Sequence, residues 1–142
     1  MQAGLLYGEQ IVSLELPDRV TLLGMKPAEP LPDQTSAVQE ALANPIESPP
    51  LTKLARGRKS ACIVISDITR PVPNKIILPP LLKTLEESGI GRKDITILIA
   101  TGMHRPNQGD ELESMIGREI MDHFTIVNHY CQKPGGYRKI DE

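Results

Sequence analysis

The sequence of 142 residues predicts an α/β fold. Two apolar runs, Ala61 to Ile65 and Ile95 to Ala100, have the length of buried strands, and Phe124 to Val127 is a third candidate. The first two runs are each followed by a polar loop and then by a helical pattern, which favours a parallel sheet with right-handed crossovers. We therefore expect a Rossmann-like parallel sheet with flanking helices, preceded by a small antiparallel N-terminal hairpin or meander.

The expected antiparallel part comes first in the chain. Gly4 to Tyr7 and Gln10 to Leu16 alternate well enough to form a hairpin around a turn at Gly8-Glu9. Arg19 to Leu23 is a candidate third strand. A proline-rich stretch follows and is interpreted as an extended connector into the α/β part.

Two helices are expected before the first parallel strand. Asp33 is placed to cap a helix that continues through Ala43, since an aspartate side chain can accept from the free amides of a first turn. Pro49-Pro50 then introduces a second, short helix over Leu51 to Ala55.

A longer helix is expected over Asn74 to Ser88, with Gly89 as its C-terminal stop. Its apolar face consists of Ile77, Leu81, Leu82 and Leu85. Pro79 and Pro80 remove amide donors near its start, so we expect the first turn to be kinked against the rest of the helix.

The last third of the chain has weaker signals. Asn107, with Asp110 three residues on, resembles a capping pair for a helix that ends at Gly117. The segment from His129 to Glu142 carries little apolar material and is interpreted as a connector.

Composition and charge argue against several partners and locations. A formal net charge of -2 gives no footprint for nucleic acid or an anionic membrane. No apolar segment approaches the roughly 20 residues that span a bilayer. Cys62 and Cys131 form no C-x-x-C pair and the chain does not open on a secretory leader, so we expect a cytoplasmic protein. We expect Cys62 to be a small buried residue of its strand.

The first strand is followed by S-D-I-T-R-P-V-P at positions 66–73. Pro71 and Pro73 favour an extended conformation for Arg70 and Val72, the residues before them, which predicts a stiff arm that fixes the direction of Arg70. The guanidinium is a planar fork suited to phosphate or carboxylate, and such a contact contributes about 1.5 to 3 kcal/mol. The alternative is an ion pair between Asp67 and Arg70 that ties down a turn.

The second strand is followed by A-T-G-M-H-R-P at positions 100–106. A loop histidine such as His104 can accept a proton from a hydroxyl near neutral pH, which contributes about 10² to 10⁴ in rate. The alternative is a structural hydrogen-bonding role. His123 and His129 lack the spacing of a helical ligand pair and would stand about 20 Å apart along a strand, so we predict no metal site.

The two loops are expected to lie together. Adjacent parallel strands are about 4.8 Å apart, and ligands of open α/β sheets bind beyond the carboxyl ends of the strands. Both loops could therefore contact one nucleotide-sized ligand.

These motifs, with the strand D-I-T-I-L-I-A at 94–100, closely resemble the nickel-dependent lactate racemase family over Ile11 to His129. The resemblance implies that residues 1–142 are the N-terminal catalytic and cofactor-binding domain of a two-domain isomerase that interconverts the enantiomers of a 2-hydroxy acid such as lactate. It also implies a nickel-pincer nucleotide cofactor, pyridinium-3,5-bisthiocarboxylic acid mononucleotide nickel. Family members act on different 2-hydroxy acids, so the substrate is left open.

Carried over residue by residue, the resemblance implies that Asp67, Ile68, Thr69 and Arg70 hold the cofactor. Arg70 would also orient the substrate carboxylate, and His104 would be one of two acid/base histidines that exchange the hydroxyl proton while the Cα hydride moves to the cofactor. The modified lysine, the second acid/base histidine and the nickel-ligating histidine of the family lie farther along. We therefore expect a C-terminal domain, missing here, to complete the cofactor site, and this chain alone to be an inactive fragment.

Two other functions remain open. A non-enzymatic nucleotide- or phosphate-binding α/β domain would keep the Asp67 loop but have no use for His104. A purely structural domain would only pack against a missing partner.

Overall fold

The computed structural model describes residues 1–8, 10–129 and 131, and it divides into two units, Met1–Pro30 and Leu31–Glu142. The first unit contains an antiparallel hairpin of β1 (Gln2–Tyr7) and β2 (Gln10–Glu15). The predicted hairpin is confirmed. Of its turn, Gly8 takes a φ of 62°, whereas Glu9 lies outside the described residues.

The candidate third strand at Arg19 to Leu23 is wrong, so this unit is a hairpin and not a meander. Pro17 opens a turn in which the amide of Val20 donates to the Pro17 carbonyl at 3.3 Å. Beyond that turn, the described residues up to Pro32 form no helix or strand. The turn that Pro17 opens therefore outweighed the alternation of side chains that had suggested a strand.

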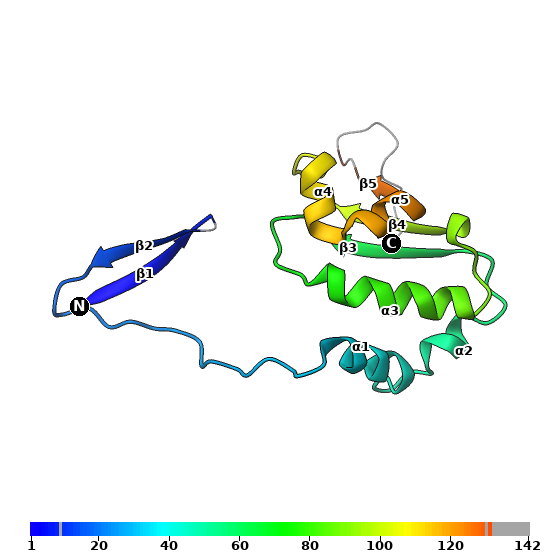
Figure 1. Cartoon of the computed structure of the whole chain (residues 1–142), viewed down its shortest axis with the longest axis horizontal. Coiled ribbons are helices and arrows are strands. Elements are labelled where there is room, and N and C mark those ends of the chain that lie inside the picture. Colours follow the sequence, from blue (N-terminus) through cyan, green and yellow to red (C-terminus); the bar gives the residue numbers. More distant parts are fainter. Residues whose placement is uncertain (9, 130, 132–142) are drawn as a thin grey trace, which may run out of the picture. The chain divides into compact units, whose positions relative to one another are not determined.

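The second unit is built on a three-stranded parallel sheet with the order β3-β4-β5 (Figure 1). Its strands are β3 (Ala61–Ser66), β4 (Ile95–Ala100) and β5 (Thr125–Asn128). The connections contain α3 (Asn74–Glu87), a 3₁₀ turn at Arg92–Asp94, α4 (Gly109–Ile116) and α5 (Arg118–His123). The predicted α/β fold, with flanking helices and a preceding hairpin, is confirmed.

The core lies between the helices and one face of the sheet. Ile95, Ile97 and Ile99 of β4 are fully buried and pack with residues of α3, α4 and α5. The alternate side chains behave differently, because Val64 and Val127 flank Leu98 in register and are 62% and 41% exposed. The helices of the described part therefore cover a single face of the sheet.

Cys62 is exposed, so the expectation of a buried cysteine is wrong. It lies on β3, an edge strand, two residues before Val64 and therefore on the same uncovered face. Among the described residues, no helix is long and apolar enough to cross a membrane.

The two early helices form as predicted, as α1 (Gln34–Ala43) and α2 (Leu51–Ala55). Asp33 caps α1 by accepting from the Ser36 amide at 2.9 Å. Both helices contact α3, and Figure 1 shows them on the side of α3 away from the sheet. They form a second layer behind the helix that covers β3 and β4.

The helix α3 continues through both of its prolines, and Gly89 follows it with a φ of 99° as the predicted stop. Its buried face is rotated from the predicted one, because Leu78 is 1% exposed whereas Ile77 and Leu81 are only partly buried. The buried apolar side chains are Leu78, Pro80, Leu82 and Leu85. The kink at the prolines stays a prediction.

Three expectations for the last third are corrected or limited by the structure. The helix α4 begins at Gly109 after Gln108, so Asn107 is not its cap. The short helix α5 was not predicted, and it carries His123, which therefore does not lie on a strand. Of the expected connector after β5, only His129 and Cys131 belong to the described residues.

Candidate functional site

The loops that follow β3 and β4 line one open pocket of about 260 Å³ at the carboxyl ends of these strands. Ser66, Asp67, Thr69 and Arg70 come from the first loop. Residues 100–104, which include His104, come from the second. The loops are neighbours because β3 and β4 pair in parallel, with Ser66 opposite Ala100. Of the predicted site residues, only Ile68 does not line this pocket.

Asp67 joins the two loops through a direct contact with His104. Its Oδ2 lies 2.5 Å from Nδ1 of His104. Its Oδ1 accepts from the hydroxyl of Thr69 at 2.6 Å and from the Thr69 amide at 3.2 Å. The Asp67 side chain is 6% exposed, whereas that of His104 is 55% exposed. A buried carboxylate thus holds an imidazole that faces solvent.

The electrostatics of the pair favour an ionised Asp67. The hydrogen bond from the Thr69 hydroxyl lowers the pKa of Asp67 most, and the contact with His104 lowers it further, against a smaller effect of burial. The partner of Asp67 is therefore a histidine and not Arg70. The alternative in which Asp67 and Arg70 form an ion pair is not what the structure contains.

Arg70 has an unneutralised guanidinium. Its Nη1 makes only long contacts of 3.4 Å with the carbonyl and hydroxyl oxygens of Thr69. Among the described residues, no carboxylate lies within ion-pair distance of it, although four other lysine and arginine side chains have such partners. A charge without a partner at the rim of a pocket is suited to an anionic ligand.

The proline arm after Arg70 contains two tight turns, centred on Pro71 and Pro73. The Val72 amide donates to the Arg70 carbonyl at 2.8 Å, and the Asn74 amide donates to the Val72 carbonyl at 2.8 Å. These are two successive three-residue turns, and Pro73, with φ -77° and ψ 60°, has the geometry of an inverse γ-turn. The fixed φ of proline favours such turns, so the arm is stiff but compact.

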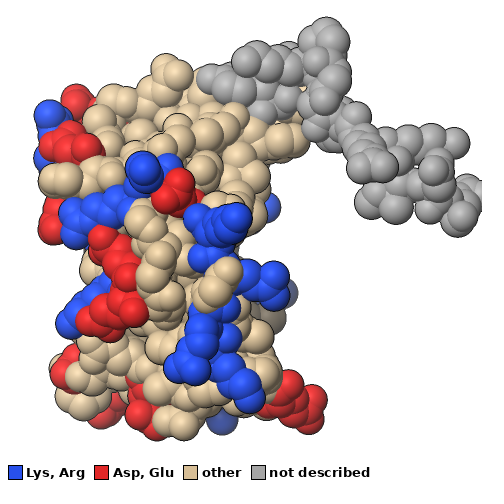
Figure 2. Space-filling view, turned by 90° about the vertical axis from the view of Figure 1, so that its right-hand side faces the viewer, with Lys and Arg blue, Asp and Glu red and all other residues tan. Residues whose placement is uncertain are grey.

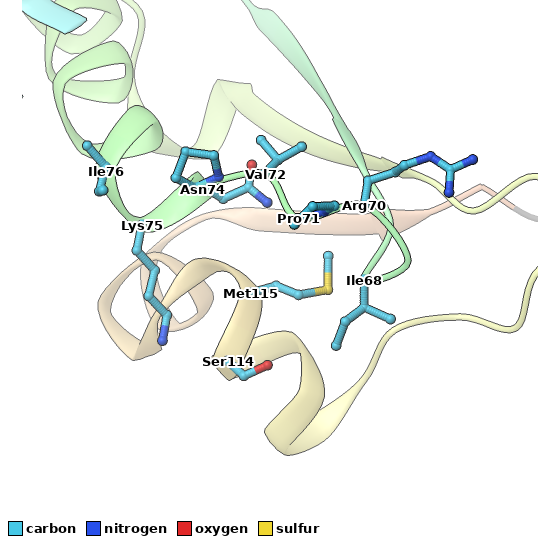
Figure 3. Close-up of a pocket in the computed structure, with 10 residues that line it drawn as sticks. Ile68, Arg70, Pro71, Val72, Asn74, Lys75, Ile76, Ser114 and Met115 are labelled. Atoms are coloured by element: carbon cyan, nitrogen blue, oxygen red, sulfur yellow. The ribbon is translucent and has the colours of Figure 1, made fainter. Parts of the chain in front are cut away.

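A second pocket of about 290 Å³ lies between this arm and α4. Figure 3 shows Met115 of α4 reaching toward Ile68, with Pro71 and Val72 on the opposite wall. The guanidinium of Arg70 extends away from both Met115 and Lys75. The charge of Arg70 is therefore not directed into this pocket.

The backbone amides of the two loops differ in availability. The amides of Ile68, Thr69 and Arg70 all donate within the protein, to Asn107 Oδ1, Asp67 Oδ1 and the Asp67 carbonyl. In the second loop, the amides of Gly102 and Met103 have no acceptor within the described part of the chain. Free donors therefore lie on the His104 side of the pocket.

Gly102 is required by its backbone and not by crowding. Its φ is 56°, a left-handed value that L side chains rarely adopt, and a Cβ there would meet no atom within 4 Å. The turn closes when the His104 amide donates to the Thr101 carbonyl at 2.9 Å. This turn presents the imidazole at the pocket.

Sequence reasoning missed the role of Asn107, which is 1% exposed. Its Oδ1 accepts from the Ile68 amide at 3.4 Å, its Nδ2 donates to Glu111, and its backbone exchanges two bonds of 2.9 and 3.0 Å with the side chain of Asn128. Asn107 thus joins the Asp67 loop, α4 and β5. The signal was an amide side chain directly after A-T-G-M-H-R-P, which we interpreted as a helix cap.

The other histidines lie outside the pocket. His123 is on α5, where its Nδ1 contacts the Glu119 carbonyl at 2.7 Å, and the amide of His129 donates to Ile99 at 2.9 Å. In the described ranges, no three His, Cys, Asp or Glu side chains are grouped closely enough to hold a metal ion.

Figure 2 shows the side of the molecule turned away from these two loops. Lys and Arg side chains lie beside Asp and Glu over much of this face. The surface is mixed in charge, in keeping with a formal net charge of -2.

The chain is similar to known proteins over most of its length. The family model of the lactate racemase N-terminal domain matches residues 7–142. The chain is 39% identical over 109 residues to a lactate racemase of Lactiplantibacillus plantarum, covering 77% of this chain and 26% of that protein. It is 34% identical over 127 residues to a lactate racemase of Thermoanaerobacterium thermosaccharolyticum, covering 87% and 30%.

Solved structures agree on the fold. The lactate racemase apoprotein of T. thermosaccharolyticum matches with a TM-score of 0.69 and 32% identity, over 92% of this chain and 30% of that one. A protein of Thermotoga maritima matches with a TM-score of 0.52 and 23% identity, over 71% and 22%, which supports the fold alone. The chain spans less than a third of the length of the relatives it matches.

Proposed function

The chain belongs to the family of lactate racemase N-terminal domains, and from this premise we propose that it forms the N-terminal catalytic part of a racemase for lactate or a similar 2-hydroxy acid. The observation that carries the proposal is the pair of Asp67 and His104 in the pocket that Arg70 also lines. The pocket combines a group that can exchange a proton with a group that can bind a carboxylate. A 2-hydroxy acid offers both a hydroxyl and a carboxylate.

His104 is proposed to exchange the hydroxyl proton of the substrate. Its Nδ1 is engaged by Asp67 at 2.5 Å, so Nε2 is the ring atom left to accept this proton and to return it. Racemisation requires the planar keto acid to be reduced from either face. A second acid/base group on the opposite side of the substrate is therefore needed, and we propose that the C-terminal domain supplies it.

Arg70 is proposed to bind the carboxylate. The guanidinium has no acidic partner among the described residues, and the turns at Pro71 and Pro73 restrict the backbone that carries it. A fixed fork loses little conformational entropy when it binds, so the contact contributes about 1.5 to 3 kcal/mol.

A nickel-pincer nucleotide is the proposed cofactor, and the residues present fit it in part. Arg70 can hold the phosphate of a mononucleotide, and the unpaired amides of Gly102 and Met103 line the same pocket. Asp67 and the amides of Ile68 and Thr69 are already engaged within the protein. When bound, the cofactor would supply the acceptor for the hydrogen at Cα.

The competing function is a phosphate-binding domain without catalysis. It would use Arg70 in the same way, but it would not require a histidine whose imidazole is held by a buried carboxylate. The Asp67 and His104 pair therefore favours the enzyme.

The test compares the complete two-domain protein with residues 1–142, both purified from cells that make the cofactor. Nickel content and the chiral composition of lactate after incubation are measured. We expect the complete protein to convert either enantiomer of lactate toward the racemate. We expect residues 1–142 to show no conversion and to retain no stoichiometric nickel. A complete protein that binds nickel and nucleotide without converting lactate or any similar 2-hydroxy acid would contradict the racemase. Turnover by residues 1–142 would contradict the two-domain site.

A further inference from the structure

Asp67 has a more specific part in this pocket than contact with a cofactor. We propose that Asp67 is a positioning residue that fixes the imidazole of His104 in the tautomer with hydrogen on Nδ1 and a free lone pair on Nε2. The inference rests on the proposed function, since it states how the proton acceptor of that function is set.

Both oxygens of the Asp67 carboxylate are occupied by the protein. Oδ1 accepts two hydrogen bonds from Thr69, at 2.6 and 3.2 Å, and Oδ2 faces Nδ1 of His104 at 2.5 Å. Only 6% of the side chain is exposed. Little of the carboxylate is left for a ligand to contact, whereas more than half of the His104 side chain remains accessible.

The chemistry of the pair determines the tautomer. An ionised carboxylate is only an acceptor, and a neutral imidazole carries one hydrogen on its two ring nitrogens. Nδ1 must therefore carry that hydrogen to bond with Oδ2, which leaves Nε2 as the acceptor. The hydrogen bonds from Thr69 lower the pKa of Asp67 and so keep it in the ionised form that this argument requires.

The backbone holds both partners in place. The Arg70 amide donates to the Asp67 carbonyl at 3.1 Å and the Ile68 amide to Asn107, so the turn that carries Asp67 is closed. The His104 amide donates to Thr101 at 2.9 Å. The imidazole can therefore rotate little without losing its bond to Asp67.

An amide at position 67 would reverse the tautomer. Thr69 donates two hydrogen bonds to Oδ1, so the carbonyl oxygen of Asn in Asp67→Asn would take that place. Its NH₂ group would then face His104 and donate to Nδ1. The ring hydrogen would move to Nε2, and the atom assigned to accept the substrate proton would no longer be an acceptor.

The first measurement reads the tautomer without any assay of activity. The chain contains three histidines, and ¹⁵N labelling of them with long-range ¹H–¹⁵N correlation distinguishes the two tautomers at about pH 9, where an ordinary imidazole is neutral. His104→Gln assigns the signal. We expect hydrogen on Nδ1 in the wild type and on Nε2 in Asp67→Asn. Hydrogen on Nε2 in the wild type, or no change in Asp67→Asn, would overturn the proposal.

Thr69→Val is the matched control. It removes the hydroxyl that donates to Oδ1 but leaves Oδ2 and His104 in place, so the wild-type tautomer should remain. If Thr69→Val moved the hydrogen to Nε2 as Asp67→Asn does, then any disturbance of the loop would change the tautomer. The proposal that Asp67 itself sets the tautomer would fail.

The second measurement uses the complete protein loaded with cofactor. Asp67→Asn should lower kcat by about 10²-fold or more, with a smaller effect on KM and unchanged nickel content. Loss of nickel with an unchanged tautomer would show that Asp67 is a cofactor ligand and would overturn the proposal. If the wild type racemised neither lactate nor any similar 2-hydroxy acid, the proposed function would fail, whereas the tautomer would still decide the role of Asp67.

Discussion

The loops after β3 and β4 lie at the same edge of the sheet, yet they are built in opposite ways. Every amide from Ile68 to Arg70 donates within the protein. In the other loop, the amides of Gly102 and Met103 are unpaired within the described part, and His104 is exposed. The amides of the first loop are therefore all satisfied within the protein, whereas two amides of the second loop are free to bind a ligand. We call the first the closed loop and the second the open loop.

This difference gives the two loops different roles, because one positions a side chain and the other carries the side chain that faces a ligand. The closed loop contributes a buried carboxylate that orients the histidine, and the open loop contributes the histidine itself. Arg70 is the exception, because its side chain leaves the closed loop with an unpaired charge. A site divided in this way has buried groups whose loss should reduce stability and exposed side chains whose loss should reduce binding or turnover alone.

Replacing Arg70 gives the largest expected effect among four tests of this division. Arg70→Ala in the complete protein should lower kcat/KM for lactate or the affinity for cofactor by roughly 10- to 150-fold, since a charge-assisted contact of about 1.5 to 3 kcal/mol is lost. Arg70→Lys should restore part of it, because an ammonium lacks the bidentate fork.

The control is Arg118→Ala, which removes an exposed arginine of α5 that is paired with Glu113 and Asp122 and does not line the pocket. Surface pairs contribute about 0 to 1 kcal/mol to stability, and kinetics should not change. Equal losses in the two variants would mean that Arg70 acts only through the stability of the domain.

Asn107→Ala should affect folding more than any change to an exposed loop side chain. It leaves the Ile68 amide and Glu111 of α4 without their bonds to Asn107, which costs about 1 to 3 kcal/mol in the free energy of unfolding. Urea unfolding of this chain measures the loss, with exposed Gln108→Ala as the control. Unchanged stability would mean that Asn107 does not join the loops.

Gly102→Ala should cost about 1 to 2 kcal/mol in the free energy of unfolding, because a side chain is forced into a left-handed conformation at φ 56°. Gly24→Ala, at a position without a positive φ and with open space around it, should be nearly neutral. Thermal or urea unfolding compares the two. Equal effects would show that the turn before His104 does not depend on its glycine.

The smallest expected effect is a change in the stability of the protein at acidic pH. The pKa of Asp67 is lower in the folded protein than in the unfolded chain, so its contribution to stability is present above the ordinary aspartate pKa and is lost as pH falls through the folded value. The stability difference between wild type and Asp67→Asn should therefore shrink below about pH 4. Asp33 and Glu111, whose pKa values are also lowered, are present in both proteins and cancel. A constant difference down to pH 3 would contradict the shift.

Local patterns were enough to predict the parallel sheet and its first helices. The strands β3 and β4 begin and end within a residue of the apolar runs, because a buried strand leaves a continuous apolar signal. The cap at Asp33 was equally readable, since its partner Ser36 is only three residues away. Because each motif directly follows a parallel strand, both loops were also predicted to lie at the carboxyl edge of the sheet.

Contacts between residues far apart in the sequence could not be predicted. Asp67 and His104 are 37 positions apart, and Asn107 and Asn128 are 21 apart, so no spacing rule connects them. The exposure of Cys62 depends on a sheet face left uncovered, which the strand itself does not reveal. The turns centred on Pro71 and Pro73 depend on two backbone hydrogen bonds that the restriction of the residues before each proline does not predict.

The central claim is that the exposed histidine of the open loop exchanges the substrate proton. Its most direct test is the rate of chiral conversion of lactate by His104→Gln and wild type in the complete protein, compared at equal nickel content. We expect the variant to retain nickel and to lose about 10²-fold or more in rate. Conversion by His104→Gln at the wild-type rate per bound nickel would contradict the claim.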